Sequence, residues 1–586
     1  HYYQSTVSGR AYKFNILNEL ANTGNESTQT DLKGIVSLNV NLYKGLKYEG
    51  LFSYSSSHST ARDYATEKSA YVADIRGYNY GEGSEEDIEK SPMPYGGVYN
   101  ETTYEQRSSL IRNGLTYKGS LTEDLSIDVL LGQEFRNTNY KGLKSNNYGY
   151  FHDRGNTFYE PALGESTGNL QRNKVTRSLV DRSNISYYGV VSAMYGDRYV
   201  LNANIRFDGS NLFGSNPKYR YLPLWSVSGR WIISNESFLS DNEVLSNLAL
   251  RASYGLRGNI VEDSSPSIIA AALPPNAVTG LFEMEIQQAP NPDLKWETTA
   301  SFNVGLELGL FDDRLSLDVD YYLDESKDLI AYKRVSSVSG FSGKYVNYAD
   351  VRNQGIDVSL SGTLLKNKDW RWTAAFNMGY VKNKVTKSTS TAQAKYLVQS
   401  VYTPGEVYEG KPVDGMFSYR FAKLDDKGMP MFYDKDGNVL GVDSEEIVNY
   451  PYDLGNLKYE GTRDPLFSGG LNTRVSYKNV SLSMLFAFGL KNVVRLPARA
   501  YVTTPEEDQN ANSSIKDRWR PGQDNTGKTI PALSAGDGYI TTADGNFYAT
   551  DWYNLSDQTV VPGDYLRFRN LMIEYQLPAR WTNKVV

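Results

Sequence analysis

Hydrophobic and polar residues alternate with a period of two along much of the chain. In residues 297–310, and again after the short turn Phe311-Asp312-Asp313, every second residue is apolar. The apolar residues of the two runs are Ala300, Phe302, Val304, Leu306, Leu308 and Leu310, then Leu315, Leu317, Val319, Tyr321 and Leu323. Because successive side chains of a strand point to opposite faces, the runs predict two β-strands, each with one apolar face, joined as a hairpin.

About fifteen runs of this kind occur along the chain. They lie near residues 34, 46, 109, 125, 182, 198, 225, 247, 297, 314, 354, 371, 468, 480 and 565. Several are about 10 to 13 residues long, whereas strands of soluble sheets average roughly 5 to 6 residues. About 9 to 11 tilted residues cross a bilayer, so the runs have the length of membrane-spanning strands.

The connections between the runs alternate between short and long. Short ones lie at 43–45, 118–124, 196–197, 311–313, 366–369 and 478–479. Long ones lie at about 56–108, 137–181, 257–296, 327–353, 382–467 and 490–564. Short turns on one rim and long extracellular loops on the other are typical of outer-membrane barrels. A soluble sandwich or propeller would explain the alternation, but neither the strand length nor the one-sided loops.

The polar face of the runs indicates what lies inside such a barrel. One run carries Asn202, Asn204, Arg206 and Asp208 on the same side. Buried without partners, such groups would cost roughly 1–3 kcal/mol each, so we expect a wide, water-filled lumen. The sequence therefore predicts an all-β fold in which residues 1–586 form one large antiparallel transmembrane β-barrel region.

Composition excludes several other classes of protein. The 586 residues contain no long apolar stretch that could form a membrane-spanning helix. Cysteine is absent, which removes disulfides, thiolate metal ligands and cysteine nucleophiles. The net charge of −7 argues against nucleic acid as a partner.

Seven short segments resemble the SusC/RagA family of TonB-dependent outer-membrane transporters. The most distinctive is Asn291-Pro292-Asp293-Leu294-Lys295-Trp296-Glu297, directly before a predicted strand. The others follow the family's order and lie at 207–211, 250–255, 314–322, 353–356, 517–522 and 563–571. Residues 1–206 match only as a pattern of hairpins.

The resemblance implies a barrel of about 22 strands around an N-terminal plug. It also implies a TonB energy-transducing complex and a SusD-like surface lipoprotein as partners, in the lipid bilayer of a bacterial outer membrane. Neither a plug nor the family's last strand is recognisable here. We therefore expect that the sequence is part of a longer polypeptide, and that the TonB complex acts through a region absent from it.

Aromatic and amide side chains in the predicted long loops are the candidate substrate-binding residues. They are Tyr78, Tyr80, Tyr95, Tyr99, Asn147, Tyr148, Tyr150 and Trp552. Flat rings stack on sugar faces and also pack on peptides, while amides serve either ligand. The alternative is that these residues fasten loops together or contact the cap lipoprotein.

No pattern indicates catalysis, a metal or a cofactor. Asp434-Lys435-Asp436-Gly437-Asn438 has some features of a calcium loop, but Asp-Gly between two apolar runs better predicts a hairpin turn. The three histidines, His1, His58 and His152, lie far apart in the sequence. We expect no metal site, no cofactor and no enzyme activity.

The function that these features and the resemblance predict is TonB-dependent import of oligosaccharides or oligopeptides. The residue pattern does not choose between the two substrates. The alternatives are a passive outer-membrane porin and a non-transporting β-rich adhesin or structural protein.

Overall fold

The computed structural model describes residues 3–7, 10–159, 174–211, 221–239, 242–259, 268–273, 275–276, 278–288, 290–334, 338, 343–388, 393–399, 407–502, 512–533, 538–542 and 545–577. A sheet of 16 strands dominates this part of the chain. Its strand order is β29-β24-β23-β17-β16-β15-β14-β11-β10-β9-β8-β6-β5-β4-β3, and β7 (Thr157–Phe158) pairs with β6. Among the described residues, no helix has the length and apolar character needed to cross a membrane.

The long strands of this sheet coincide with the predicted alternating runs. They are β3 (Thr23–Tyr43), β4 (Leu46–Ala65), β5 (Gly97–Ser120), β6 (Leu125–Phe151), β8 (Lys174–Tyr195), β9 (Tyr199–Ser210), β10 (Tyr221–Ile232), β11 (Leu245–Asn259), β14 (Glu297–Leu310), β15 (Leu315–Arg334), β16 (Gly343–Lys366), β17 (Trp370–Ser388), β23 (Phe467–Tyr477), β24 (Val480–Leu490) and β29 (Tyr565–Tyr575). The predicted antiparallel strands are therefore confirmed.

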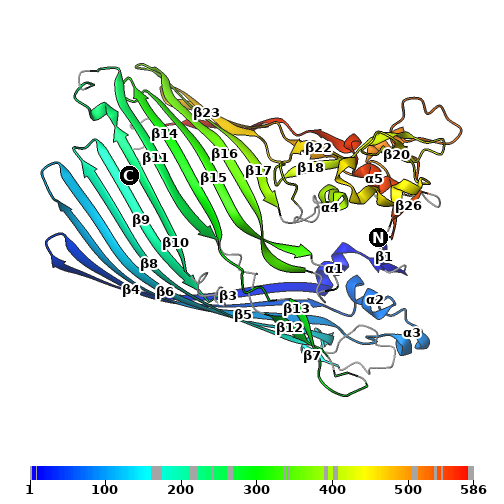
Figure 1. Cartoon of the computed structure of the whole chain (residues 1–586). Coiled ribbons are helices and arrows are strands. Elements are labelled where there is room, and N and C mark those ends of the chain that lie inside the picture. The colour runs from blue at the N-terminus through cyan, green and yellow to red at the C-terminus, as the bar shows by residue number, and fades with distance from the viewer. Residues whose placement is uncertain are drawn as a thin grey trace. The chain divides into compact units, whose positions relative to one another are not determined.

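The register of the strands gathers their apolar residues into rows. Leu306 of β14 pairs with Val319 of β15, which pairs with Val358 of β16, which pairs with Met378 of β17. Parallel rows join Val304 to Tyr321 and Leu308 to Leu317. Figure 1 shows β14, β15, β16 and β17 side by side. A slip of one residue would turn these apolar side chains to the polar face, so the pattern itself fixes the register.

A network of ion pairs occupies the opposite, polar face of the same strands. Arg251 of β11 reaches across β14 to Asp320 of β15, with 2.5 Å between Nη2 and Oδ2. It also pairs with Glu307 at 3.3 Å, and Glu307 pairs with Arg230 of β10 at 2.5 Å. Gly305 lies between Arg251 and Asp320 in the register. A Cβ at Gly305 would lie 2.4 Å from Nε of Arg251 and 2.5 Å from Oδ1 of Asp320, so any other residue would make these two side chains shift.

Several strands continue beyond the residues at which the alternation ends. Residues 56–65 and 97–108, which fall in a predicted long loop, belong to β4 and β5. The segment that connects these two strands is therefore 66–96. Its two helices are α2 (Ala70–Arg76) and α3 (Glu85–Lys90). That the long connections face the cell exterior stays a prediction.

The chain divides into two compact units. Unit 1 is His1–Lys118, Val129–Gly189 and Arg206–Leu212, and unit 2 is Gly119–Asp128, Val190–Ile205 and Phe213–Val586. Besides its long strands and α2 and α3, unit 1 contains β1 (Tyr3–Val7), β2 (Arg10–Phe14) and α1 (Ile16–Asn22). Its small buried core consists of Ala65, Val72, Met93 and Val98.

Unit 2 carries short elements in the connections between its long strands. They are η2 (Ile233–Asn235), β12 (Ile269–Ala272), β13 (Met284–Gln288), α4 (Ala394–Gln399), β18 (Gly415–Tyr419), β19 (Phe421–Leu424), β20 (Pro430–Tyr433), β21 (Val439–Leu440), η4 (Glu445–Tyr452), η5 (Leu454–Asn456), β22 (Leu457–Thr462), β25 (Val493–Arg495), η6 (Ser513–Asp517), β26 (Tyr539–Thr542), β27 (Gly545–Tyr548), α5 (Ala549–Asn554), η7 (Asp557–Thr559) and β28 (Val560–Pro562). In Figure 1, α4, α5, β18, β20, β22 and β26 gather together. Tyr419, Phe432, Tyr450 and Trp552 lie in the core of this cluster.

Candidate functional site

A cavity of about 590 Å³ lies in unit 1, among the ends of strands that join the long connections. Its lining comes from four long strands and the segment after β6, namely Gly24, Asn25, Glu26, Arg62, Tyr64, Tyr99, Tyr150, His152, Asn156 and Phe158. Residues as far apart in the sequence as Gly24 and Phe158 meet here, because β3, β4, β5 and β6 are neighbours in the sheet and β7 pairs with β6. The register places Tyr64 directly opposite Tyr99.

The aromatic wall of the cavity is centred on Tyr150. Its ring centre is 5.0 Å from that of Tyr99, 5.4 Å from that of Phe158 and 5.9 Å from that of Tyr64. His152 stacks on Tyr64, with ring centres 4.6 Å apart and planes 11° from parallel. Tyr150 is only 4% exposed, and its burial raises the pKa of its hydroxyl. The ring of Tyr150 therefore supports the wall, while Phe158, His152 and part of Tyr99 present surface to the cavity.

Hydrogen bonds fix the polar groups beside this wall. The Tyr150 hydroxyl donates to Oδ1 of Asn156 at 2.6 Å and lies 3.0 Å from Nδ1 of His152. Arg62 Nε donates to Oε2 of Glu101 at 2.9 Å, and the Tyr99 hydroxyl donates to the same oxygen at 3.0 Å. The hydrogen bond from Arg62 is the main cause that lowers the pKa of the Glu101 carboxyl. Glu101 thus stays ionised and holds both side chains in place.

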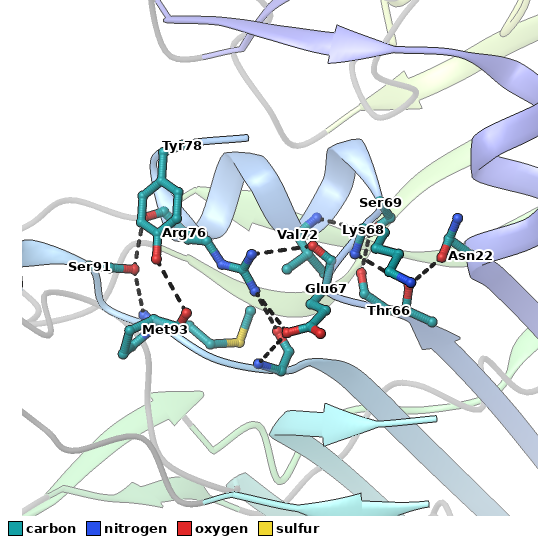
Figure 2. Close-up of polar contacts among 12 residues, drawn as sticks. Asn22, Thr66, Glu67, Lys68, Ser69, Val72, Arg76, Tyr78, Ser91 and Met93 are labelled. Atoms are coloured by element: carbon teal, nitrogen blue, oxygen red, sulfur yellow. Dashed lines mark hydrogen bonds and ion pairs between the residues drawn. The ribbon is translucent and has the colours of Figure 1, made fainter. Parts of the chain in front are cut away.

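A buried ion pair stabilises the connecting segment 66–96 beside the cavity. Arg76 of α2 is 3% exposed and donates to the carbonyl oxygens of Glu67 at 3.3 Å and Gly96 at 3.0 Å (Figure 2). Its Nη2 lies 3.9 Å from Oε2 of Glu67, and Arg154 approaches Oε1 of the same carboxylate at 3.3 Å. Burial lowers the pKa of Arg76, but an arginine still remains charged at neutral pH.

Local sequence explains why this segment folds as it does. Ser69 caps α2 by accepting a hydrogen bond from Val72 N at 3.2 Å (Figure 2). Gly77 ends the helix with a φ of 91°, a left-handed conformation that glycine adopts without strain. Thr66 donates its hydroxyl to Oδ1 of Asn22 at 2.7 Å, which ties the segment to the residue before β3. The segment that connects Tyr64 and Tyr99 of the cavity lining is therefore held in a fixed conformation.

The structure brings two of the predicted substrate-binding residues, Tyr99 and Tyr150, into the cavity. Tyr148 instead packs against the small core of unit 1. Tyr78 donates its hydroxyl to the Pro94 carbonyl at 3.2 Å, with the Arg76 guanidinium 5.5 Å from its ring. These contacts correspond to the alternative in which an aromatic residue fastens a loop.

The other predicted residues are not among those that line the cavity. Tyr80 is 47% exposed near Lys68, and Tyr95 is 48% exposed and meets Tyr159 edge to face. Asn147 donates to Ser145 at 3.3 Å. Trp552 lies in α5 of unit 2, is 4% exposed, and stacks on Tyr419 with ring centres 4.9 Å apart.

Sequence reasoning did not single out Tyr64, Arg62, His152, Asn156 and Phe158. They come from separate stretches of the sequence, and strand pairing brings these stretches together. One available signal was Tyr64 at the end of the polar stretch Ser55–Tyr64. A large aromatic side chain in a strand with solvent on both faces indicates that the ring has a specific contact.

The predicted turn at Asp434–Asn438 is confirmed as the connection between β20 and β21. Oδ1 of Asp434 accepts hydrogen bonds from Asp436 N at 2.9 Å and from Asn438 N at 2.8 Å. Its carboxylate thus closes the turn. Among the described residues, no three His, Cys, Asp or Glu side chains are grouped closely enough to hold a metal ion.

Long paired strands with one apolar and one charged face, joined alternately by short turns and large folded loops, define the class of outer-membrane β-barrels. The model of the family described as "TonB dependent receptor-like, beta-barrel" matches residues 2–584, and the chain belongs to this family. The predicted outer-membrane location and the resemblance to SusC/RagA transporters are both confirmed.

Named relatives and solved structures agree with this assignment. TonB-dependent receptor P3 of Formosa agariphila is 27% identical over 522 residues, which are 83% of this chain and 47% of that protein. TonB-dependent receptor SusC of Bacteroides thetaiotaomicron is 26% identical over 360 residues, which are 57% of this chain and 33% of SusC. The chain thus spans about half the length, or less, of the curated relatives it matches.

Solved structures share the fold. A chain of the RagAB peptide importer in its open-open state superposes with a TM-score of 0.75 at 21% identity, covering 99% of this chain and 58% of that one. Another structure of the RagAB peptide transporter gives a TM-score of 0.72 at 22% identity, covering 95% of this chain and 56% of the other. At this level of identity the likeness establishes the fold.

Proposed function

We propose that the chain is the barrel of a TonB-dependent importer that takes oligosaccharides or oligopeptides across the outer membrane. The observation that carries this proposal is the family match over residues 2–584. The charged inner face supports it, because Arg230, Glu307, Arg251 and Asp320 need a water-filled lumen through which a polar solute can pass.

We propose that the cavity of unit 1 is a first binding subsite for the substrate. Exposed rings at Phe158 and His152 offer flat faces, and Asn25, Asn156 and the Arg62–Glu101 pair offer hydrogen bonds beside them. This combination suits hydroxyl groups of a sugar or the backbone of an extended peptide equally. The proposed roles of Tyr99 and Tyr150 belong to this subsite.

The proposed partners are a SusD-like lipoprotein that covers the outer opening and a TonB complex that supplies energy. SusC is named among the relatives, and the neighbouring structures are of a complex called RagAB. Since the relatives are receptors, we propose no catalytic step. We expect a surface lipoprotein to copurify with the affinity-tagged full-length protein after detergent extraction. Purification of the tagged protein without a lipoprotein would argue against this partnership.

Uptake with and without TonB tests the proposed import. Cells that express the full-length protein should accumulate fluorescein-labelled maltoheptaose or labelled casein peptides of about ten residues, and deletion of TonB should abolish this. Phe158→Ala and His152→Ala should each raise the KM of uptake about tenfold, because a stacked ring contributes roughly 1 kcal/mol or more. Tyr71→Ala, at an exposed tyrosine of α2 outside the cavity, is the matched control.

Two results would favour the alternatives. Uptake that persists without TonB would identify a passive porin. Absence of uptake of both probes, together with release of the protein from membranes by salt washing, would identify an adhesin or structural protein.

A further inference from the structure

A second cavity, of about 760 Å³, lies in the loop cluster of unit 2, and none of its lining residues lines the cavity of unit 1. Three segments line it, the turn between β19 and β20, the segment that follows η6, and the stretch near Leu533. The lining residues that carry the argument are Asp426, Lys427, Arg518, Trp519 and Arg520. Three cations and one carboxylate therefore face one cavity, in a chain whose net charge is −7.

Backbone hydrogen bonds hold the three segments together. Trp519 N donates to the Ile530 carbonyl at 2.9 Å, and Ala532 N donates to the Gly428 carbonyl at 2.9 Å. Asn525 accepts from Arg520 N at 2.9 Å and donates to the Arg520 carbonyl at 2.7 Å. The backbone that carries the two arginines and the tryptophan between them is therefore already ordered. This order reduces the conformational entropy that is lost when a ligand binds.

The turn around Gly428 supports the indole of Trp519. It packs over Gly428, where an added Cβ would lie 2.5 Å from the ring, and Gly428 has a φ of +78° that favours glycine. Asp425 Oδ1 accepts from Lys427 N at 2.9 Å and from Met429 N at 2.7 Å, which fixes this turn. One side of the indole is thus supported by backbone while the residue also lines the cavity.

The cations of the cavity are available to an anion. Arg518 Nη1 donates to the Ile515 carbonyl at 2.9 Å, and Arg520 Nη2 donates to the Lys516 carbonyl at 3.3 Å. Within the described part of the chain, no carboxylate lies at ion-pair distance from either guanidinium, and the nearby Asp517 pairs with Lys528 at 3.8 Å. Guanidinium groups bind carboxylates through paired, charge-assisted hydrogen bonds.

We propose that this cavity binds an acidic oligosaccharide, a sugar whose ring bears a carboxylate. Arg518 and Arg520 flank Trp519 in the sequence, and all three residues line the cavity. The ligand that fits best therefore carries an anionic group directly beside a flat apolar face. A uronic acid has this arrangement, because its carboxylate is attached to the ring whose C–H face stacks on an aromatic side chain. In an acidic peptide the carboxylate sits on a flexible chain with no such face. This binding goes beyond the proposed import and does not depend on it.

Calorimetric titration of the full-length protein in detergent tests the proposal. Trigalacturonate should bind, maltotriose should bind at least tenfold more weakly, and raising NaCl from about 50 to 500 mM should weaken only the former. Arg518→Gln with Arg520→Gln should raise the Kd for trigalacturonate tenfold or more. Lys516→Gln removes a neighbouring charge outside the lining and should change the Kd less than threefold.

A gain of affinity separates binding from misfolding. Asp426→Asn removes the one carboxylate of the lining and should tighten trigalacturonate binding about threefold or more. Protection of the Ala532 amide from hydrogen exchange should be unchanged in each variant. No binding of trigalacturonate, equal binding of maltotriose, an unaffected double variant, or tighter binding of the peptide Glu-Ala-Glu would overturn the proposal. Because titration needs no TonB, loss of uptake with retained binding would contradict only the importer.

Discussion

At the scale of single residues, one glycine determines which charges can meet on the polar face. Gly305 has no side chain between Arg251 and Asp320, and these two residues span the strand on which it lies. The pair is part-exposed, with relative side-chain exposures of 40% and 21%, so by itself it contributes about 0–1 kcal/mol. A side chain at position 305 would have to displace both of these side chains.

We expect Gly305→Val to destabilise the barrel because its Cβ would force Arg251 and Asp320 apart. In an Arg251→Ala background the same change should cost less, since the nearer clashing side chain is gone. The difference between the two backgrounds should be about 0.5–1 kcal/mol, measured by urea unfolding in a double-mutant cycle. Equal costs in both backgrounds would show that the glycine serves another purpose.

The same scale shows why the candidate site was only partly predictable. The local sequence around an aromatic residue does not show whether the ring lines a cavity, as in Tyr99, or packs in a core, as in Trp552. Trp552 stacks on Tyr419, which lies 133 positions earlier in the sequence, and no local sequence pattern predicts that contact. The cavity depends on the register that sets Tyr64 opposite Tyr99, which the sequence does not display.

At the scale of elements, the strands were predictable wherever one face is apolar. In β14 and β15 the alternation persists from Ala300 to Leu323 and gives the pairing directly. In β4 it stops near Ser55, although the hydrogen-bonded ladder continues to Ala65. We attribute this to water on both faces of the outer part of the strand, which removes the need for alternation.

The helices of the connecting segment were not predicted. α2 and α3 have only 7 and 6 residues, too few for a hydrophobic period to emerge. The available signal was capping, since Ser84 and Asp87 form a capping box at α3. The sequence Glu85–Glu89 reads as a solvated acidic run, which hides the cap.

The buried Arg76–Glu67 pair makes a prediction about this segment. Arg76→Leu should lower the free energy of opening of α2 by about 1–3 kcal/mol, because the carbonyls of Glu67 and Gly96 lose their buried donor and the Glu67 carboxylate loses one of its two arginines. Arg76→Leu with Glu67→Leu should recover part of the loss. Hydrogen exchange at Ala73 and Gly77, whose amides bond within α2, measures both.

The control for that experiment is the ion pair between Lys90 and Glu86 on α3. Their side chains are 70% and 74% exposed, so Lys90→Leu should change local stability by no more than about 0.5 kcal/mol. If Arg76→Leu had as small an effect, the buried pair would not be what holds the segment.

At the scale of the whole molecule, every conclusion rests on a sheet with one face in lipid and the other in water. Family membership, the apolar rows and the charged network agree on this. The fifteen long strands of the sheet and their two faces followed from periodicity. The folded loop cluster of unit 2 did not, because its contacts join residues more than 100 positions apart, such as Tyr419 and Trp552.

Spin labels along β15 test this central claim most directly, and the absence of cysteine from these 586 residues means that no other label attaches within them. Single cysteines would replace residues 317 to 322 in the full-length protein reconstituted in bilayers. We predict that labels at 317, 319 and 321 collide with oxygen, which concentrates in lipid, and that labels at 318, 320 and 322 collide with a water-soluble nickel chelate. Collision rates that do not alternate from one position to the next would contradict a sheet with one face in lipid and the other in water. Collision with the nickel chelate at all six positions would contradict it as well.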